Sequence, residues 1–475
     1  MNNCATPESE VRQAISGLLA REPGFGPDSL ERLRLFGTAP PFDTHHKLTV
    51  AAASAIGAYA LAVEKWWHEC TGQHQVIGMD LMQAACALHP GHFQKQSGYA
   101  FPAMSLLTEL KADFFRTADS RWFFPVGATP KLRDAVLDLL QCANNQEALG
   151  TSVAKWRAED IEAEFAQRKI PGAYARSREE WLLHPQGELL SRTGAIEIEK
   201  IGDSEPEPPR AGLRPLDQLR VLDLGHIIAG PVAARTLAEH GAQVLRVSPP
   251  MRQDPFRYTI DTNIGKRSAF LDLNRDVDAL QARQLMVGAD VVVESWRPGS
   301  LKRRGLGAQE SAALRPGIVY VSVSAFGDNG PWGTRGGYEQ LGQVVSGIAV
   351  QEGGTGKPRM VPTYLLNDYL TGYLGATGAM LALLRRAREG GSYHVKVSLA
   401  RTSMWVQGLG LYAQIDERAR GKHFDAFLQP MLEQRQSAYG LLEQLPPVAQ
   451  FSVTPAAWTL PPAPIGAHDA RWLTR

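Results

Sequence analysis

The sequence has few cysteines and almost no net charge. Its four cysteines, Cys4, Cys70, Cys86 and Cys142, lie in the first third of the chain without C-x-x-C spacing. This pattern predicts free thiols in a reducing compartment and excludes a disulfide framework. No histidine cluster completes a zinc pattern, so no metal site is expected. The formal net charge of +1 and the dispersed basic residues argue against a nucleic-acid partner.

Long apolar runs are also missing. The N-terminus carries acidic residues and lacks the apolar stretch of a signal peptide. The two most apolar windows, Ala51–Val63 and Gly372–Leu384, are too short to cross a bilayer and predict buried helices. We therefore expect a cytoplasmic protein without a membrane partner.

Several familiar catalytic motifs are absent. G-x-G-x-x-G does not follow the first predicted strand of the second half, Arg220–Leu224, which disfavours a nicotinamide dehydrogenase. Neither G-x-S-x-G nor H-E-x-x-H occurs. The glycine-rich run at 353–356 has no following Lys-Ser/Thr pair, so it predicts a turn and no phosphate loop.

What the sequence does contain is a proline-rich break followed by alternating strands and helices. The break predicts a linker at 202–217 between an N-terminal segment (1–201) and an α/β domain (218–445), with an irregular tail at 446–475. Strand-like runs such as Val244–Val247 alternate with helical periods after the linker. The fold class is therefore α/β, with a parallel, Rossmann-like sheet in a large domain and a smaller α+β domain.

Two distant segments repeat one pattern. Gly57–Ala85 and Gly378–Ser403 each read as an alanine-rich helix, a glycine turn and a strand centred on Val76 or Val395. The offset of about 320 residues is far too long for a solenoid period. We interpret the pair as a duplicated segment with equivalent places in two related halves.

A few polar residues occur at positions where α/β proteins commonly have catalytic or ligand-binding side chains. Asp368 opens a helical pattern, where an Asp is commonly an N-cap, but its surroundings are apolar and a carboxylate there could act as a nucleophile. Glu339 lies in a glycine-flanked loop after a strand. His226 follows the first strand, where such sheets bind ligands, although a lone His is more often a structural hydrogen-bonding residue than a catalyst. The pairs Lys266-Arg267 and Arg303-Arg304 could neutralise phosphates or lie on the surface.

Taken in order, these segments resemble CoA-transferase family III, which includes formyl-CoA and carnitine CoA-transferases. The likeness runs from Arg220 to about Gly410 and is carried by VLDLGHIIAGP, HGAQVLRV, NIGKRSAFLDL, ADVVVESWRPGSLKRRGLG, YVSVSAFGDNGP, GYEQLGQVVSG and LNDYLTG. The resemblance implies the family III fold, coenzyme A as substrate with no permanently bound cofactor, acyl-CoA and carboxylic acids as partners, and a homodimer.

The resemblance also implies roles for single residues. Asp368 matches the nucleophilic aspartate that forms an acyl anhydride and then a CoA thioester, with Glu339 and Tyr338 beside it. The positions that match CoA contacts are His226, Ala229, Leu271, Trp296, Arg303 and Arg304.

Three departures from the family pattern keep other functions open. The apolar Ile228 argues against a very small acyl group, Ser248-Pro249 removes a basic phosphate contact, and Ser295 replaces a common Asn. One alternative is an acyl-CoA racemase of the same family, although those enzymes carry a His where this chain has Tyr338. The other is a non-catalytic acyl-CoA-binding protein.

The first 200 residues resemble the later half of the same family. The likeness is carried by Arg121–Gly127, Trp156–Glu164 and Ser177–Leu190. The stretch that matches Asp368 falls near Thr44–Leu48 and contains no acid. We expect this copy to be non-catalytic, to form the smaller domain and to line the pocket, which leaves one catalytic site per chain.

Overall fold

A seven-stranded sheet forms the centre of the protein, whose computed structural model describes residues 6–101, 110–210, 212–251 and 254–474. The strands are β8 (Glu197–Gly202), β9 (Arg220–Asp223), β10 (Gln243–Ser248), β11 (Lys266–Phe270), β12 (Val291–Glu294), β13 (Val319–Ser324) and β14 (Ser392–Ser398). Their order is β11-β10-β9-β12-β13-β14-β8, all parallel except the edge strand β8. The chain direction across the sheet reverses between β9 and β12, which is where doubly wound sheets bind ligands.

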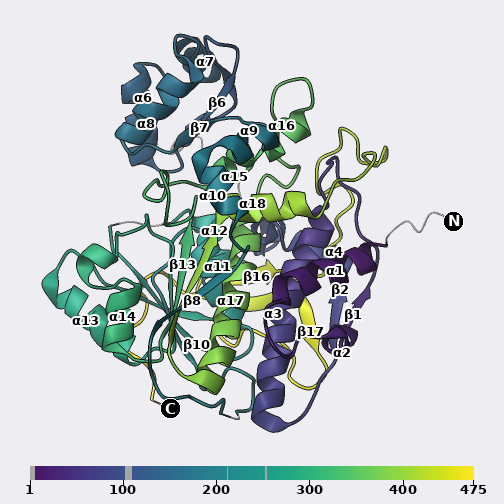
Figure 1. The fold of residues 1–475 in the computed structure, drawn as a ribbon, viewed down its shortest axis with the longest axis vertical. Coiled ribbons are helices and arrows are strands. Elements are labelled where there is room, and N and C mark those ends of the chain that lie inside the picture. Colours follow the sequence, from purple (N-terminus) through teal and green to yellow (C-terminus); the bar gives the residue numbers. More distant parts are fainter. Residues whose placement is uncertain (1–5, 102–109, 211, 252–253, 475) are drawn as a thin grey trace.

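Alternate residues of each strand enter two different cores, as a sheet covered on both faces requires. Val221 faces the larger core, which includes side chains of α1 (Pro7–Leu19), α3 (Leu48–Thr71), α11 (Ala229–Ala238) and α17 (Asn367–Glu389). Leu222 faces a smaller core against α13 (Asp276–Val287) and α14 (Ala308–Leu314). Figure 1 shows these two layers on opposite sides of the strands. The predicted parallel α/β fold is confirmed.

The predicted domain boundaries differ from the division that the cores show. The larger core joins side chains on both sides of residues 202–217, and β8 extends the central sheet. A separate core belongs to residues 110–174 alone. This small domain contains β5 (Phe115–Arg116), β6 (Trp122–Pro125), β7 (Gly172–Tyr174), α6 (Pro130–Leu140), α7 (Gln146–Val153) and α8 (Ala158–Gln167), and stands at the top of Figure 1.

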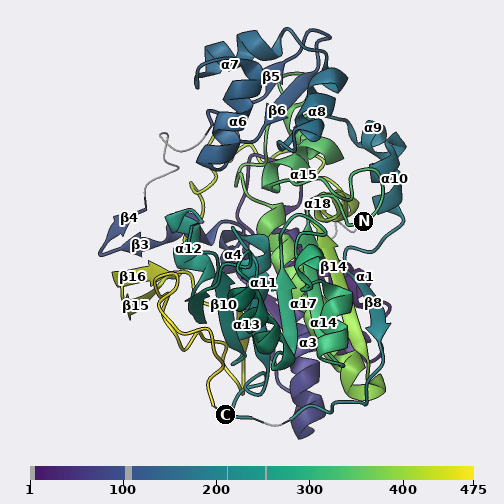
Figure 2. The ribbon, with the colours of Figure 1, turned by 90° about the vertical axis from the view of Figure 1, so that its left-hand side faces the viewer.

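The remaining elements lie around these two bodies. They are α2 (Pro27–Glu31), β1 (Leu33–Phe36), β2 (Ile77–Asp80), α4 (Leu81–Cys86), α5 (Pro90–Phe93), β3 (Lys95–Gln96), β4 (Tyr99–Ala100), α9 (Arg178–Leu183), α10 (Pro185–Ser191), α12 (Phe256–Thr262), a 3₁₀ turn (Lys302–Arg304), α15 (Glu339–Ser346), α16 (Ile348–Gly353), α18 (Leu399–Gly408), β15 (Glu433–Ser437), β16 (Gly440–Gln444) and β17 (Ala449–Phe451). The tail is not wholly irregular, because β17 pairs with β2. A four-stranded sheet, β15-β16-β3-β4, projects at the side in Figure 2.

The two echoing segments have the same local structure. Each is a long helix that ends at a glycine with positive φ, Gly72 or Gly390, followed by a strand and a second helix. α3 and α17 lie side by side in the larger core. The residue the same distance before Gly72 as Asp368 is before Gly390 is the apolar Val50, so the N-terminal copy has no acid at this position. The likeness supports the duplication, which stays a prediction.

α3 is longer than the apolar window of the sequence suggests. Its 24 residues have the length and composition of a membrane span, but 94% of its most apolar window is buried inside the protein. It is therefore the central helix of the larger core. Cys70, Cys86 and Cys142 are free thiols as expected, and Cys4 lies outside the described residues.

Candidate active site

A cleft of about 1610 Å³ opens between the carboxyl ends of the sheet strands and the small domain. His226 after β9 and Trp296 after β12 line it at the point where the strand order reverses. The start of α6 and residues 168–171 of the small domain line the opposite wall. Its volume exceeds that of an ordinary small-molecule pocket and suits a long ligand.

Asp368 is the one carboxylate among the described residues that line this cleft. It lies in the first turn of α17 and is 8% exposed. The positive end of the helix dipole favours an anion at this position. The preceding loop is strained, since Tyr364 has a φ of 61°. Gln343 holds that loop by donating to the Tyr364 carbonyl and accepting from the Val361 N–H.

Glu339 holds the start of α17 from behind the cleft. Its Oε2 accepts the backbone N–H of Asp368 at 2.6 Å, and its Oε1 accepts from Gln343 at 2.7 Å and Asn367 at 3.3 Å. It is 2% exposed and does not line the cleft. Glu339 therefore positions Asp368 and has no access to a ligand in the cleft.

Asp368 and Glu339 form a coupled acidic pair. Burial raises the pKa of Asp368 well above its ordinary value, and the negative charge of Glu339 raises it further. Burial also raises the pKa of Glu339 to about 7, against the hydrogen bonds from Gln343 and backbone N–H groups that lower it. The donors to Glu339 favour its ionised form, whereas burial and the Glu339 charge both disfavour the ionised form of Asp368.

The turn after β9 brings His226 and Trp296 together. Their rings stack with centroids 4.4 Å apart, and Trp296 Nε1 donates to the Leu224 carbonyl at 2.6 Å. Ile227 has a φ of 63°, which is an outlier for a β-branched residue and costs about 1–3 kcal/mol. Asp254 accepts the Ile227 N–H at 2.8 Å and so holds the strained turn.

The structure brings most of the predicted site residues to the cleft, but not all. The predicted residues that line it are Asp368, Tyr338, His226, Ala229, Trp296 and Arg303, and Ile228 and Ser295 line it too. Leu271 is 4% exposed within the core beneath α13. Arg304 turns away and donates to Ser300 and Asn274.

The pair Lys266-Arg267 is structural. Lys266 is fully buried and donates to Asp223 and to the Pro231 carbonyl, both at 2.6 Å. Arg267 donates to the carbonyl of Arg471 in the tail. The Lys266-Arg267 pair in the sequence does not indicate that Lys266 forms a buried ion pair with Asp223.

Sequence reasoning missed most of the basic lining of the cleft. Besides Arg303, the cations that line it are Lys131, Arg168, Lys169, Arg257, Arg297 and Arg335. Three of them belong to the small domain, and they are brought near Asp368 only by tertiary packing. The cleft as a whole therefore has a strongly basic lining.

Comparison with known proteins gives one consistent family. Residues 216–428 match the family model of CoA-transferase family III. The chain is 35% identical over 263 residues to acetyl-coenzyme A transferase nodX of Hypoxylon pulicicidum, covering 52% of this chain and 44% of that one. Succinyl-CoA–D-citramalate CoA-transferase of Chloroflexus aurantiacus is 35% identical over 211 residues, with 41% and 51% covered.

A solved structure is similar over a comparable stretch. The Mycobacterium tuberculosis protein Rv3272 shares 32% identity and a TM-score of 0.40, covering 41% of this chain and 56% of that one. The chain spans about half the length of the curated relatives it matches.

Proposed function

Residues 216–428 belong to CoA-transferase family III, and from this premise we propose that the chain moves coenzyme A from an acyl-CoA thioester to a carboxylic acid, with Asp368 as the nucleophile. The observation that carries the proposal is that, among the described residues, a single buried carboxylate lines a large cleft whose lining also includes several basic side chains. A CoA thioester presents phosphates and an electrophilic carbonyl, which match these two features.

The proposed exchange proceeds through covalent intermediates on Asp368. The ionised carboxylate attacks the donor thioester, which forms a mixed anhydride and releases CoA thiolate. The thiolate attacks the aspartyl carbonyl, which forms an aspartyl–CoA thioester and releases the donor acid. An acceptor carboxylate then attacks the aspartyl–CoA thioester, which forms a second anhydride and again releases CoA thiolate. The thiolate attacks the acceptor carbonyl, which forms the acceptor's CoA thioester and restores the Asp368 carboxylate. This route divides one difficult exchange into easier steps.

Side chains that line the cleft match the phosphates and the acyl end of an acyl-CoA. Lys131, Lys169 and Arg303 are positioned to neutralise phosphates from both walls of the cleft. The stacked His226 and Trp296 rings line the path towards Asp368. The buried Ile228 narrows the acyl end with an apolar group, which favours an acyl group larger than a formyl or oxalyl group.

Two further properties belong to this proposal. CoA serves as a substrate and carrier, and no cofactor is permanently bound. The protein works in the cytoplasm and forms a homodimer. Sedimentation analysis of the purified chain tests the homodimer directly.

Covalent capture tests the proposal. The protein is incubated with a panel of acyl-CoA thioesters, treated with hydroxylamine and digested. The mass of the peptide that contains Asp368 is then measured by mass spectrometry. We expect a hydroxamate on Asp368 only when a productive thioester is present. Asp276→Asn is the matched control, because Asp276 also lies in the first turn of a helix but does not line the cleft.

The outcomes separate the alternatives. Asp368→Asn should abolish labelling and exchange, whereas Asp276→Asn should leave both unchanged. If Asp368→Asn still exchanges CoA at the rate of the unchanged chain, the proposal is wrong. Exchange of an α-proton with deuterated water, without any acceptor acid, would favour a racemase instead. Tight CoA binding without turnover on any thioester would favour a non-catalytic binding protein.

A further inference from the structure

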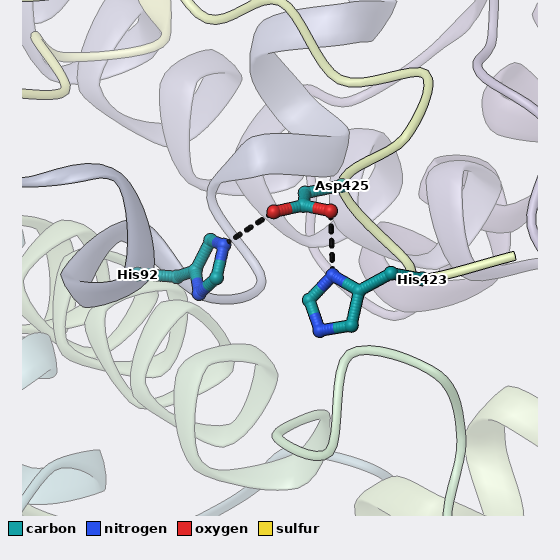
Figure 3. Close-up of side chains that lie close together, drawn as sticks. All are labelled: His92, His423 and Asp425. Atoms are coloured by element: carbon teal, nitrogen blue, oxygen red, sulfur yellow. Dashed lines mark hydrogen bonds and ion pairs between the residues drawn. The ribbon is translucent and has the colours of Figure 1, made fainter. Parts of the chain in front are cut away.

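Two histidines and an aspartate converge outside the cleft. His92 lies at the end of α5, and His423 and Asp425 lie in residues 411–432, a segment without helix or strand that we call the strap. Asp425 accepts from His92 Nε2 at 2.8 Å and from His423 Nδ1 at 2.5 Å. Figure 3 shows the carboxylate between the two rings, with one oxygen facing each.

The three side chains are held in this arrangement by a buried anchor. Phe424, between the two strap ligands in sequence, is 8% exposed and belongs to the larger core. Its ring lies 4.6 Å from that of His92 and 4.8 Å from that of His423. The anchor fixes the backbone on both sides, so His423 and Asp425 meet α5 without further ordering of the strap.

We propose that His92, His423 and Asp425 form a binding site for a divalent transition ion of the zinc class, which ties the strap to α5. The donor atoms of the three side chains all lie within 4.8 Å of one another. Two imidazole nitrogens and one carboxylate oxygen are ligands that zinc prefers, and three protein ligands leave a position for water. An ion would replace the protons that now link each ring to Asp425.

The site is accessible to an ion, and a third imidazole lies close by. The His423 side chain is 65% exposed, and that of His92 is 26% exposed. His89, one turn before His92, is 8% exposed and donates from Nδ1 to the Thr363 carbonyl at 3.0 Å. Metal-ligating histidines commonly have this arrangement, with one nitrogen held by a carbonyl. Its buried Nε2 has no hydrogen-bond partner among the described residues.

Charge also favours a cation here. The one carboxylate of the cluster, Asp425, lies between the two rings and offers a negatively charged ligand. Arg257 of α12 contacts His92 at Nδ1, 3.5 Å away, and also donates to the Gly91 carbonyl. The ligand nitrogen of His92 faces Asp425 on its other edge.

Metal titration of the full chain tests the proposal. The metal-free protein is titrated with zinc chloride, and cobalt(II) is then used for its visible absorption in the same site. We expect one ion per chain, release of protons on binding, and a cobalt band typical of mixed nitrogen and oxygen ligands. His423→Gln and Asp425→Asn should each weaken zinc binding by more than about 10-fold, a loss that even outer-shell changes reach.

The controls distinguish this site from the proposed catalytic one and from loose surface binding. Asp416→Asn removes another strap carboxylate, one that pairs only with Arg418, and should leave zinc binding unchanged. Asp368→Asn should also bind zinc as the unchanged chain does. The proposal is overturned if the chain binds zinc no more tightly than Asp425→Asn, or if the cobalt spectrum is the same in both.

Discussion

At the scale of single residues, the proposed chemistry depends on where one proton lies. Asp368 needs to be ionised to attack a thioester, yet burial and the charge of Glu339 raise its pKa. The same Glu339 fixes the start of α17 through the Asp368 N–H. One acid therefore provides the geometry of the nucleophile and also limits the pH range in which it reacts.

The variant Glu339→Gln separates these two effects. Glutamine keeps an oxygen that accepts the Asp368 N–H, but it removes the negative charge that raises the pKa of Asp368. The labelling rate of the unchanged chain should rise with pH as Asp368 ionises, at a pH well above the ordinary pKa of an aspartate. In Glu339→Gln this rise should move to lower pH by about one unit or more, the usual effect of a nearby like charge. A pH profile with an unmoved midpoint would contradict the coupling.

Sequence reasoning reached Asp368 because family blocks surround it, but it did not reveal the positioning role of Glu339. The local sequence GYEQ does not indicate that the Glu339 carboxylate points inward and accepts the backbone N–H of Asp368. Leu271 and Arg304 were assigned to CoA contacts by position alone, and local packing turns both away from the cleft. The sequence gives no sign of the proposed metal-ligand group, because His92 is remote in sequence from His423 and Asp425.

At the scale of elements, the site depends on the close packing of α11 and α17. A Cβ at Gly372 would lie 2.6 Å from Val232 and 2.9 Å from the Ala229 carbonyl. The two helices can therefore come this close at Gly372 only because α17 has no side chain there. This contact sets the distance between Asp368 at the start of α17 and the His226–Ala229 turn at the start of α11.

A pair of alanine substitutions tests this packing. Gly372→Ala should lower the free energy of unfolding by about 1–3 kcal/mol, the usual cost of overpacking, and should slow labelling of Asp368. Gly17→Ala in α1 has nothing within 4 Å of its new Cβ and should stabilise the protein by about 0.5–1 kcal/mol. Urea unfolding measures both. Equal effects of the two changes would refute the close-packing account.

At the scale of the whole molecule, the cleft joins parts that are far apart in sequence. Helix α17 supplies the proposed nucleophile and the loops after β9 and β12 supply the aromatic stack, while the small domain supplies Lys131, Arg168 and Lys169. The alternation of strands and helices predicted the sheet, because its hydrophobic pattern is local. The place of residues 110–174 above the strand ends depends on contacts between domains, which no local pattern encodes.

The small domain's cations should contribute to CoA binding. The double variant Lys131→Ala/Lys169→Ala should weaken CoA binding by up to about 30-fold at low salt, since each exposed ion pair contributes at most about 1 kcal/mol. The difference should shrink as salt screens the phosphates. Lys155→Ala, on the same domain but outside the cleft, is the control. If calorimetry gives the same CoA affinity for the double variant and this control, the small domain does not contribute to CoA binding.

The most direct test of Asp368 as a covalent nucleophile follows oxygen atoms through one turnover. In the proposed exchange, the restored Asp368 carboxylate carries an oxygen that came from the acceptor acid. With a productive acyl-CoA and an acceptor labelled with oxygen-18, the peptide that contains Asp368 should carry one heavy oxygen after a single turnover. The next donor acid released should then carry that atom. Exchange of CoA that leaves Asp368 unlabelled would contradict the central claim.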